Sequence, residues 1–439
     1  MISRRKFLDG MLITIAGSAL SSSAKSYGQI IGANDKINFA IIGTNSRALA
    51  HLSGLKANAS SVKITYLCDV DSRNLNKFAT KTREVFCYSP LTSSDFRTVL
   101  AAKDVDVVTI ATPDHWHAPM TILALRAGKH VYVEKPSSHN PREGELLVAA
   151  QKKYGKLVQV GNQHRSSAHE GRMIEKIHDG LIGETYYAKA WYANTRLSMG
   201  TGKVVPVPAE LNWELWQGPA PHSEYKDNIH PYNWHWLRRY GTGEALNNGT
   251  HETDVCRWAL GTGFPQSIVA QGGRYQFKDD WQFYDTLSIS MKYTDKMICW
   301  EGKSSQGMKC YGRDRGALIQ GTKGSVILAH DGYEVYDWKG LKTDEFHVGH
   351  VSASSDLLSQ DEMTDLHFAN MISSIRTGEK LHSPIDDINI SITSLQLANI
   401  SYFAGRELAV DTATGHIKND PEAMKMWERS YQPGWEPTI

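Results

Sequence analysis

The chain lacks several features that mark particular protein classes. Its 439 residues include only five cysteines, with no CxxC pair and no metal-ligand spacing among them. Because this count is odd, the thiols cannot all pair within the chain, and buried free thiols are the simplest interpretation. The motifs HExxH and GxSxG are absent as well, which leaves zinc-protease and serine-hydrolase chemistry without support. We therefore expect no metal site.

The sequence also lacks an excess of charge of either sign. Lys and Arg number 48 and Asp and Glu 47, a net charge of +1 that predicts binding to neither nucleic acid nor an anionic membrane. The length instead fits two globular domains. Aromatic residues are abundant, with twelve Trp and nineteen Tyr. Such rings stack on the apolar faces of sugars, but they also fill protein cores.

The N-terminus has only a short apolar stretch, residues 11–20, behind a twin-arginine run at Arg4 and Arg5. This stretch is too short to span a bilayer. A zone of small residues follows at 21–24, and the order predicts a twin-arginine export signal over residues 1–28, hence a periplasmic location. No cysteine follows the apolar stretch, so we expect no membrane anchor. A cytoplasmic N-terminal helix is the competing interpretation.

Residues 35–155 follow the pattern of a dinucleotide-binding domain. A predicted strand at 36–42 ends at Gly43, and a variant of GxGxxG/A follows, with Asn45 at the second glycine position. In this motif the first glycine allows a tight turn, and backbone N–H groups at the helix N-terminus hold a pyrophosphate. The residues expected to contact the cofactor here are Gly43, Thr44, Asn45, Ser46 and Arg47.

An acid ends the next predicted strand, at residues 63–68. Asp69 stands where a carboxylate bonds the ribose hydroxyls of adenosine, which favours NAD over NADP, although Arg73 is close in sequence. Further strands at 105–111 and 130–133 alternate with helices, and residues 114–117 are predicted as the exit loop of the first of them. The domain is therefore predicted as a doubly wound parallel α/β sheet. Ligands bind at the carboxyl ends of such strands. The other expected cofactor contacts are Thr112, Pro113, His115, His117, Glu134, Lys135 and Gln163.

Residues 156–410 are predicted to form a second, α+β domain. Alternating apolar and polar residues indicate strands at 185–192, 267–271, 286–293, 297–301 and 325–328. We expect a large, mostly antiparallel sheet with helices on one face, whose open face needs a lid or a partner subunit. A homodimer or homotetramer is therefore expected. Helices are predicted at 361–377 and 386–405, before a C-terminal tail at 411–439.

Two segments of this second domain are candidates for ligand contact. The loop at 161–165 should end near the nicotinamide, which makes His164 and Arg165 candidate contacts; a salt-bridged Arg and a surface His are the competing explanation. The stretch 204–236 fits regular elements poorly, as is typical of a functional lid. Its aromatic side chains would either form a pocket for a pyranose ring or only pack together and hold the long loop in place. They are Trp213, Trp216, Tyr232, Trp234, His235 and Trp236.

Several segments are distinctive when they occur together in one chain: AIIGTNSRA, the acid Asp69, ATPDHWHAPM, AGKHVYVEKP and GNQHRSS. Later segments agree with them: LNWELWQGPAP, GTGEALNNGTHETDVCRWAL and GTKGS. Together they resemble the Gfo/Idh/MocA oxidoreductases, a family that includes glucose–fructose oxidoreductase and inositol dehydrogenase. The resemblance implies a Rossmann domain paired with an α/β domain whose open sheet often forms the oligomer interface.

The resemblance also implies roles for individual residues. Lys135, in the EKP motif, matches the catalytic lysine of the family, and His251, with Asp254 three residues later, matches its catalytic histidine. Many dehydrogenase members have Asp where this chain has Asn247, and an amide cannot relay a proton. Acid–base work then shifts to Lys135 and His251. The residues expected to bind substrate are His164, Arg165, Tyr192, Trp234, His235, Asn247 and His251.

These observations lead us to expect an exported NAD-dependent oxidoreductase acting on a hydroxyl of a sugar or glycoside. Its cofactor would be tightly bound, because free NAD is scarce outside the cytoplasm. An alternative is an NAD-dependent glycosidase that oxidises, eliminates and re-reduces its substrate within one turnover. Exported relatives of that kind differ in sequence where this chain has Glu134-Lys135-Pro136. A third alternative is a non-catalytic sensor of sugar or cofactor.

Overall fold

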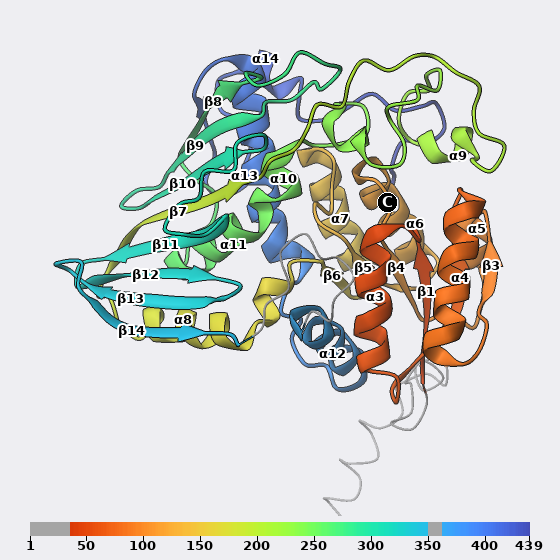
Figure 1. Ribbon diagram of the computed structural model, residues 1–439, viewed down its shortest axis with the longest axis horizontal. Coiled ribbons are helices and arrows are strands. Elements are labelled where there is room, and N and C mark those ends of the chain that lie inside the picture. Colours follow the sequence, from red (N-terminus) through yellow and green to blue (C-terminus); the bar gives the residue numbers. More distant parts are fainter. Residues whose placement is uncertain (1–35, 350–361) are drawn as a thin grey trace, which may run out of the picture.

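The computed structural model describes residues 36–349 and 362–439, so the predicted export signal over residues 1–28 lies outside the described residues. The chain forms a six-stranded parallel sheet followed by a nine-stranded mixed sheet (Figure 1). This architecture confirms the predicted fold class, a doubly wound domain joined to a domain with a large, mostly antiparallel sheet.

The first sheet has the strand order β3-β2-β1-β4-β5-β6. All five strand pairs are parallel, and the strands β1, β4 and β5 are almost wholly buried, as expected for a sheet with helices on both faces. Its strands are β1 (Ile37–Ile42), β2 (Val62–Cys68), β3 (Leu91–Ser93), β4 (Val107–Ile110), β5 (His130–Val133) and β6 (Val158–Val160). Its helices are α3 (Ser46–Ala57), α4 (Ser72–Phe86), α5 (Phe96–Ala101), α6 (Asp114–Arg126) and α7 (Pro141–Tyr154).

Two boundaries in this domain differ from the prediction. Strand β6 pairs in parallel with β5, so the first sheet extends to Val160 instead of ending at residue 155. Helix α6 begins at Asp114, so residues 114–117, predicted as a loop, form its first turn. Pro113 caps this helix in an extended conformation, and the carboxylate of Asp114 suits the positive end of the helix dipole.

The second sheet has the order β14-β13-β12-β11-β7-β10-β9-β8-β15, and only its β7–β10 pair is parallel. Its strands are β7 (Thr185–Ala193), β8 (Ser267–Gly273), β9 (Thr286–Lys292), β10 (Met297–Lys303), β11 (Arg315–Gly321), β12 (Gly324–Ala329), β13 (Gly332–Asp337), β14 (Lys342–His347) and β15 (Leu408–Ala409). The prediction missed β11, β13, β14 and β15. Strand β14 could not be recognised by alternation, because all six of its residues are exposed.

Helices cover one face of the second sheet and join it to the first domain (Figure 1). Helix α11 (Gly249–Leu260) packs on β7 and β11, and α13 (Ile385–Ala404) packs on both β8 and α7. Helix α12 (Glu362–Thr377) packs against α3 of the first domain. The remaining elements are η1 (Gln163–Ser166), α8 (Ala168–His178), α9 (Trp213–Gln217), η2 (Asn233–Trp236), α10 (Glu244–Asn247) and α14 (Pro421–Met424).

Residues 36–349 and 362–439 lack two kinds of feature. No helix in these ranges has both the length and the apolar character needed to cross a membrane. The same residues contain no cluster of three or more His, Cys, Asp or Glu side chains placed to hold a metal ion.

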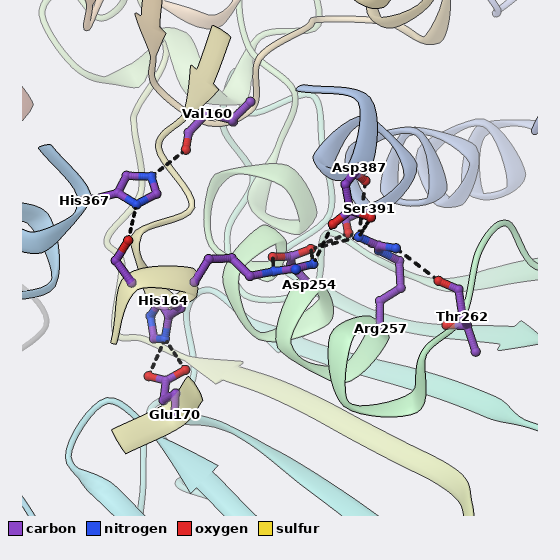
Figure 2. Close-up of polar contacts among 11 residues, drawn as sticks. Val160, His164, Glu170, Asp254, Arg257, Thr262, His367, Asp387 and Ser391 are labelled. Carbon is purple, nitrogen blue, oxygen red and sulfur yellow. Dashed lines mark hydrogen bonds and ion pairs between the residues drawn. The ribbon is translucent and has the colours of Figure 1, made fainter. Parts of the chain in front are cut away.

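A buried polar network fixes α11 to its neighbours. Arg165, in η1 after the first sheet, donates two hydrogen bonds to the carboxylate of Asp254 on α11, at 2.8 and 2.9 Å. Ser391 of α13 donates to the same carboxylate at 2.6 Å, and Asp387 lies 3.1 Å from the Arg165 guanidinium (Figure 2). The helix that carries the predicted catalytic histidine is therefore held by η1 and by α13.

Replacing Asp254 tests this network. Burial alone would raise the pKa of Asp254, but the guanidinium of Arg165 outweighs it and lowers the pKa to about 2. The stabilisation is therefore present at neutral pH and is lost only as pH falls below the unfolded value of 3.8 and through about 2. Asp254→Asn should lower the free energy of unfolding at pH 7 by about 3 kcal/mol, measured by urea denaturation, because it leaves a buried guanidinium undercompensated.

The matched control is Asp386→Asn, one residue away from the network on the exposed side of α13. It should change the free energy of unfolding by less than about 1 kcal/mol, since only a surface charge near a helix N-terminus is lost. Equal losses in the two variants would contradict the structural role of Asp254.

Candidate active site

A cleft runs along the carboxyl ends of the parallel strands, between the first domain and the irregular segments of the second. Residues from the first domain that line it include Gly43, Asn45, Ser46, Arg47, Asp69, Thr112, Pro113, His117, Glu134 and Lys135. The opposite wall includes Tyr192, Asn194, Arg196, Trp216, His230, Tyr232, Trp234, His235, Asn247 and Asn248. Most of the residues singled out from the sequence thus share one cavity.

The turn between β1 and α3 is shaped for close approach of a ligand. Gly43 has a φ of +83°, and a Cβ atom there would lie 2.6 Å from the carbonyl oxygen of Ala111. Only glycine fits this turn without strain. Asn45 has extended backbone angles and precedes the helix as its N-cap, so it needs no left-handed conformation. The N-terminus of α3, with its unsatisfied N–H groups, follows directly, which fits a pyrophosphate.

Asp69 ends β2 at one side of this turn. Its carboxylate accepts hydrogen bonds from the backbone N–H and hydroxyl of Thr44, at 2.7 and 2.8 Å, and from the N–H of Asp71. Burial raises the pKa of Asp69. Arg73 pairs with Asp71 at 2.7 Å and not with Asp69. A carboxylate without an adjoining cation suits the hydroxyls of a ribose and disfavours a phosphate, so this end of the cleft fits NAD better than NADP.

Glu134, at the end of β5, is a buried carboxylate with two partners on α3. Its Oε1 atom accepts from Nε of Arg47 at 2.7 Å and contacts Nε2 of His51 at 2.8 Å. Burial opposes ionisation, yet Arg47 and His51 together lower the pKa of Glu134. A Cβ at Gly161 would lie 2.7 Å from Oε2, so glycine is required beside the carboxylate. Glu134 therefore anchors the β5 loop to α3.

Lys135 follows, and its peptide bond to Pro136 is cis. The Nζ atom of Lys135 donates to the backbone carbonyl of Asn247 and lies 3.3 Å from the side-chain oxygen of the same residue. Burial lowers the pKa of Lys135. The amine thus reaches across the cleft to α10 of the second domain, and its neutral form is easier to populate than that of an exposed lysine.

His251 lies four residues after Asn247 but does not line the cleft. Its ring centroid is 5.2 Å from that of His164, and its Nδ1 atom is buried without a hydrogen-bond partner. Nδ1 of His164 lies 2.8 Å from Glu170 (Figure 2), which outweighs burial and raises the pKa of His164. Burial, followed by the charges of His164 and Lys135, lowers the pKa of His251. The pair therefore combines an imidazole whose surroundings favour the charged form, His164, with one whose surroundings favour the neutral form, His251.

Several other predicted contacts also lie outside the cleft. Thr44 is buried and engaged with Asp69. The ring of His115 lies between the carbonyl oxygens of Tyr240 and Trp216, and burial lowers its pKa to about 3. Gln163, His164 and Arg165 stand in or beside η1, behind the cleft wall. Arg165 is occupied by the network with Asp254.

An ion pair in the second-domain wall was not predicted from the sequence. Arg196, just after β7, pairs with the buried carboxylate of Glu244 at 2.7 Å and donates to the hydroxyl of Tyr232 at 2.8 Å. The Arg196 guanidinium also lies over the ring of Trp236, 4.9 Å from its centroid. These residues are distant in sequence and no spacing pattern links them, so only the fold reveals that they meet.

Two family models match the chain. The first, described as "Oxidoreductase family, NAD-binding Rossmann fold", matches residues 37–162. The second, described as "GFO/IDH/MocA C-terminal domain", matches residues 210–327. The two matches cover the first domain and the part of the second domain that includes α9, α10 and α11.

Curated relatives match over parts of their length. A "Glycosyl hydrolase family 109 protein" from Saccharopolyspora erythraea is 33% identical over 165 residues, covering 36% of this chain and 36% of the relative. An "Inositol 2-dehydrogenase" from Rubrobacter xylanophilus is 26% identical over 184 residues, covering 41% of this chain and 51% of the relative. The matched segments thus span between about a third and half of these relatives.

Solved structures share the fold over most of the chain. A levoglucosan dehydrogenase, in complex with NADH and levoglucosan, superposes with a TM-score of 0.65 at 17% identity, covering 85% of this chain and 99% of the other. A putative myo-inositol dehydrogenase from Sinorhizobium meliloti gives a TM-score of 0.63 at 19% identity, covering 86% and 100%. With the motifs, the two-domain fold and both family models in agreement, the chain belongs to the Gfo/Idh/MocA oxidoreductase family.

Proposed function

We propose that the protein is an NAD-dependent oxidoreductase that oxidises a hydroxyl-bearing carbon of a sugar or glycoside. The observation that carries this proposal is the placement of Lys135: its amine lies at the carboxyl edge of the cofactor domain and contacts Asn247 of the opposite domain. A substrate between these walls would meet a proton acceptor at the edge of the dinucleotide groove. Relatives named as sugar or polyol dehydrogenases support the substrate class.

Residues at different positions along the cleft would have different roles in binding and catalysis. Gly43 and the N-terminus of α3 would hold the pyrophosphate, and Asp69 the adenosine ribose. When bound, NAD supplies the hydride acceptor. The neutral amine of Lys135 takes the hydroxyl proton as the substrate C–H bond breaks and the C=O bond forms. The amide of Asn247 orients this amine and has a second donor for a substrate hydroxyl.

His251 is the second candidate for proton transfer. Its ring lies next to that of His164, and its buried Nδ1 has no hydrogen-bond partner. Because it does not line the cleft, it serves best as the group that receives the proton from Lys135 through a water molecule. Lys135 is therefore the primary base in this proposal.

Replacing Lys135 tests the assignment. Lys135→Met should leave NAD binding within about threefold of the native value and lower the rate of hydride transfer about 100-fold or more, as expected on loss of a general base. In the native protein the rate should rise with pH as the amine loses its proton, with an apparent pKa below the ordinary 10.5 of lysine. Stopped-flow absorbance of the reduced nicotinamide measures both effects.

The control is Lys152→Met, which removes an exposed lysine on α7. Its rate and pH profile should match those of the native protein. Unchanged hydride transfer in the Lys135 variant would remove this residue from the mechanism.

A second candidate function is glycoside cleavage by transient oxidation, elimination and re-reduction. It is favoured by the matches to proteins named as members of glycosyl hydrolase family 109. The retained Glu134-Lys135-Pro136 motif favours plain oxidoreduction instead. Incubation with a panel of aryl glycosides distinguishes the two by product. We expect a ketosugar, with reduced cofactor accumulating; a released aglycone with no net reduction of cofactor would establish the glycosidase.

We further propose that the protein is exported through its twin-arginine segment with NAD already bound, since folded proteins use that route. Outside the cytoplasm the cofactor would have to be recycled in place, by a second sugar or another acceptor. This proposal rests on residues 1–28 of the sequence alone.

We also propose a homodimer or homotetramer formed through the open face of the second sheet. Side chains of β7, β8, β9 and β10 line a hollow on this sheet, where Tyr187 and Val269 are only partly buried. Light scattering should give a mass of two or four chains of 49.0 kDa. Val269→Asp should shift it towards the monomer, whereas Leu366→Asp, at an exposed leucine of α12, should not. A native monomer would contradict the proposal.

A further inference from the structure

A long segment of the second domain, residues 203–241, crosses the carboxyl edge of the first sheet; we call it the strap. It contains α9, which lies above α4, α5 and α6 of the first domain (Figure 1). The strap was expected from sequence to be either a sugar pocket or a pinned loop. Its contacts with the cofactor domain indicate a third role.

The strap is attached first to the loop that follows β2. The backbone N–H of Asn212 donates to Val70 O, and that of Ser72 donates to Glu210 O, both at 2.9 Å. These bonds flank an antiparallel bridge between Asp71 and Leu211. This attachment lies directly beside Asp69, the acid at the ribose position. Farther along the strap, Nε2 of His230 lies 3.7 Å from the Asp71 carboxylate.

The second attachment is at the start of α6, after β4. The backbone N–H of His115 donates to Tyr240 O at 3.1 Å, and the indole N–H of Trp116 donates to Trp216 O at 2.9 Å. A Cβ at Gly218 would lie 1.9 Å from the Trp116 ring, so the strap backbone packs directly on that indole. Strands β2 and β4 flank β1, so the strap passes over the glycine turn from one side to the other.

The strap has a core of its own that fixes its inner surface. The rings of Trp213 and Trp216 are stacked at 4.7 Å with an interplanar angle of 17°, and Tyr225 and Tyr240 pack on their edges. Of these four, only Trp216 also lines the cleft. An aromatic ring that its neighbours hold in place forms a stacking surface at a low cost in conformational entropy.

The part of the cleft under the strap is apolar and lies at the adenosine end. Val70, Phe96 and Trp116 of the first domain line it, together with Trp216 and His230 of the strap. Lys135 is at the end of β5, which is separated from β2 by β1 and β4. Trp216 and His230 therefore meet the half of a dinucleotide that is remote from the reacting carbon.

We infer that the strap completes the binding site for the adenine nucleotide half of the cofactor. Trp216 stacks on the adenine ring, and His230 holds the strap to the loop at Asp71. The inference rests on the proposed use of NAD. An adenine ring presents a flat π-face to aromatic side chains, and Asp69 beside it accepts from ribose hydroxyls. Because the strap is attached on both sides of the glycine turn, the nucleotide leaves only when an attachment opens. Slow exchange of NAD follows.

The experiment measures exchange and competition on the full-length protein with labelled NAD. ADP should compete with labelled NAD more effectively than nicotinamide mononucleotide does. Trp216→Leu should raise the ADP concentration needed by about tenfold, the typical loss for one stacked base, without changing competition by nicotinamide mononucleotide. His230→Ala should speed release of NAD, and Trp216→Phe should restore most of the ADP competition.

Matched controls are Trp338→Leu, at a tryptophan that is 73% exposed, and His347→Ala, on the exposed strand β14. Native-like ADP competition in Trp216→Leu and native-like release in His230→Ala would overturn the inference. Equal losses for ADP and nicotinamide mononucleotide would also overturn it, because they would indicate a general collapse of the cleft. A native protein that binds no labelled NAD would instead defeat the proposed function itself.

Discussion

The site depends on one buried carboxylate, that of Glu134. A single oxygen of this side chain contacts both Arg47 and His51, which are neighbours on α3. Helix α3 begins at the glycine turn, and Glu134 immediately precedes Lys135, so the contact couples the phosphate-binding end of the cleft to the amine. A buried carboxylate is tolerated only when it is paired and hydrogen-bonded. The pairing therefore fixes positions more than it adds stability. The glycine turn at the start of α3 and the amine of Lys135 cannot move independently of each other.

The sequence was most informative where chemistry and backbone requirements coincide. Gly43, Asp69 and Lys135 each end a strand of a parallel sheet, and the topology of such a sheet brings strand ends together, so their shared cleft could be predicted. Strands with alternating burial were also recognised. Strand β14, which is exposed throughout, and β15, which has two residues, offer no such pattern.

What could not be predicted is which polar side chains pair with one another over long distances in the chain. His164 and Arg165 stand in the loop that a parallel sheet directs towards the cofactor, and on that ground they were candidates for substrate contact. Glu170 and Asp254 instead engage them behind the cleft wall. The same limit explains why the pair of Arg196 with Glu244 was missed. The spacing of residues along the sequence identifies strand ends and helix faces. Ion pairs between distant residues can be identified only from the tertiary fold.

Both explanations of the aromatic residues in the strap are correct: some of them pin the loop, and others line the cleft. Trp213 and Tyr225 pack inside the strap and do not line the cleft, as expected of residues that pin a loop. Trp234 and His235 belong to the same segment and line the cleft, with their rings stacked 3.6 Å apart. The rings inside the strap hold the rings that line the cleft in place. A segment without regular hydrogen bonding needs such a core before it can present rigid rings to a ligand.

Electrostatic balance around the cleft explains why the pKa values of Lys135 and His251 are lowered. Three buried carboxylates are each paired with an arginine: Glu134 with Arg47, Glu244 with Arg196, and Glu252 with Arg315. Each pair nearly cancels its own field, so desolvation is left as the largest influence on Lys135 and His251, and it lowers the pKa of both. A carboxylate paired directly with Lys135 would favour the ammonium form. Asn247 at that position contacts the amine without adding charge, which leaves its lone pair available for the hydroxyl proton.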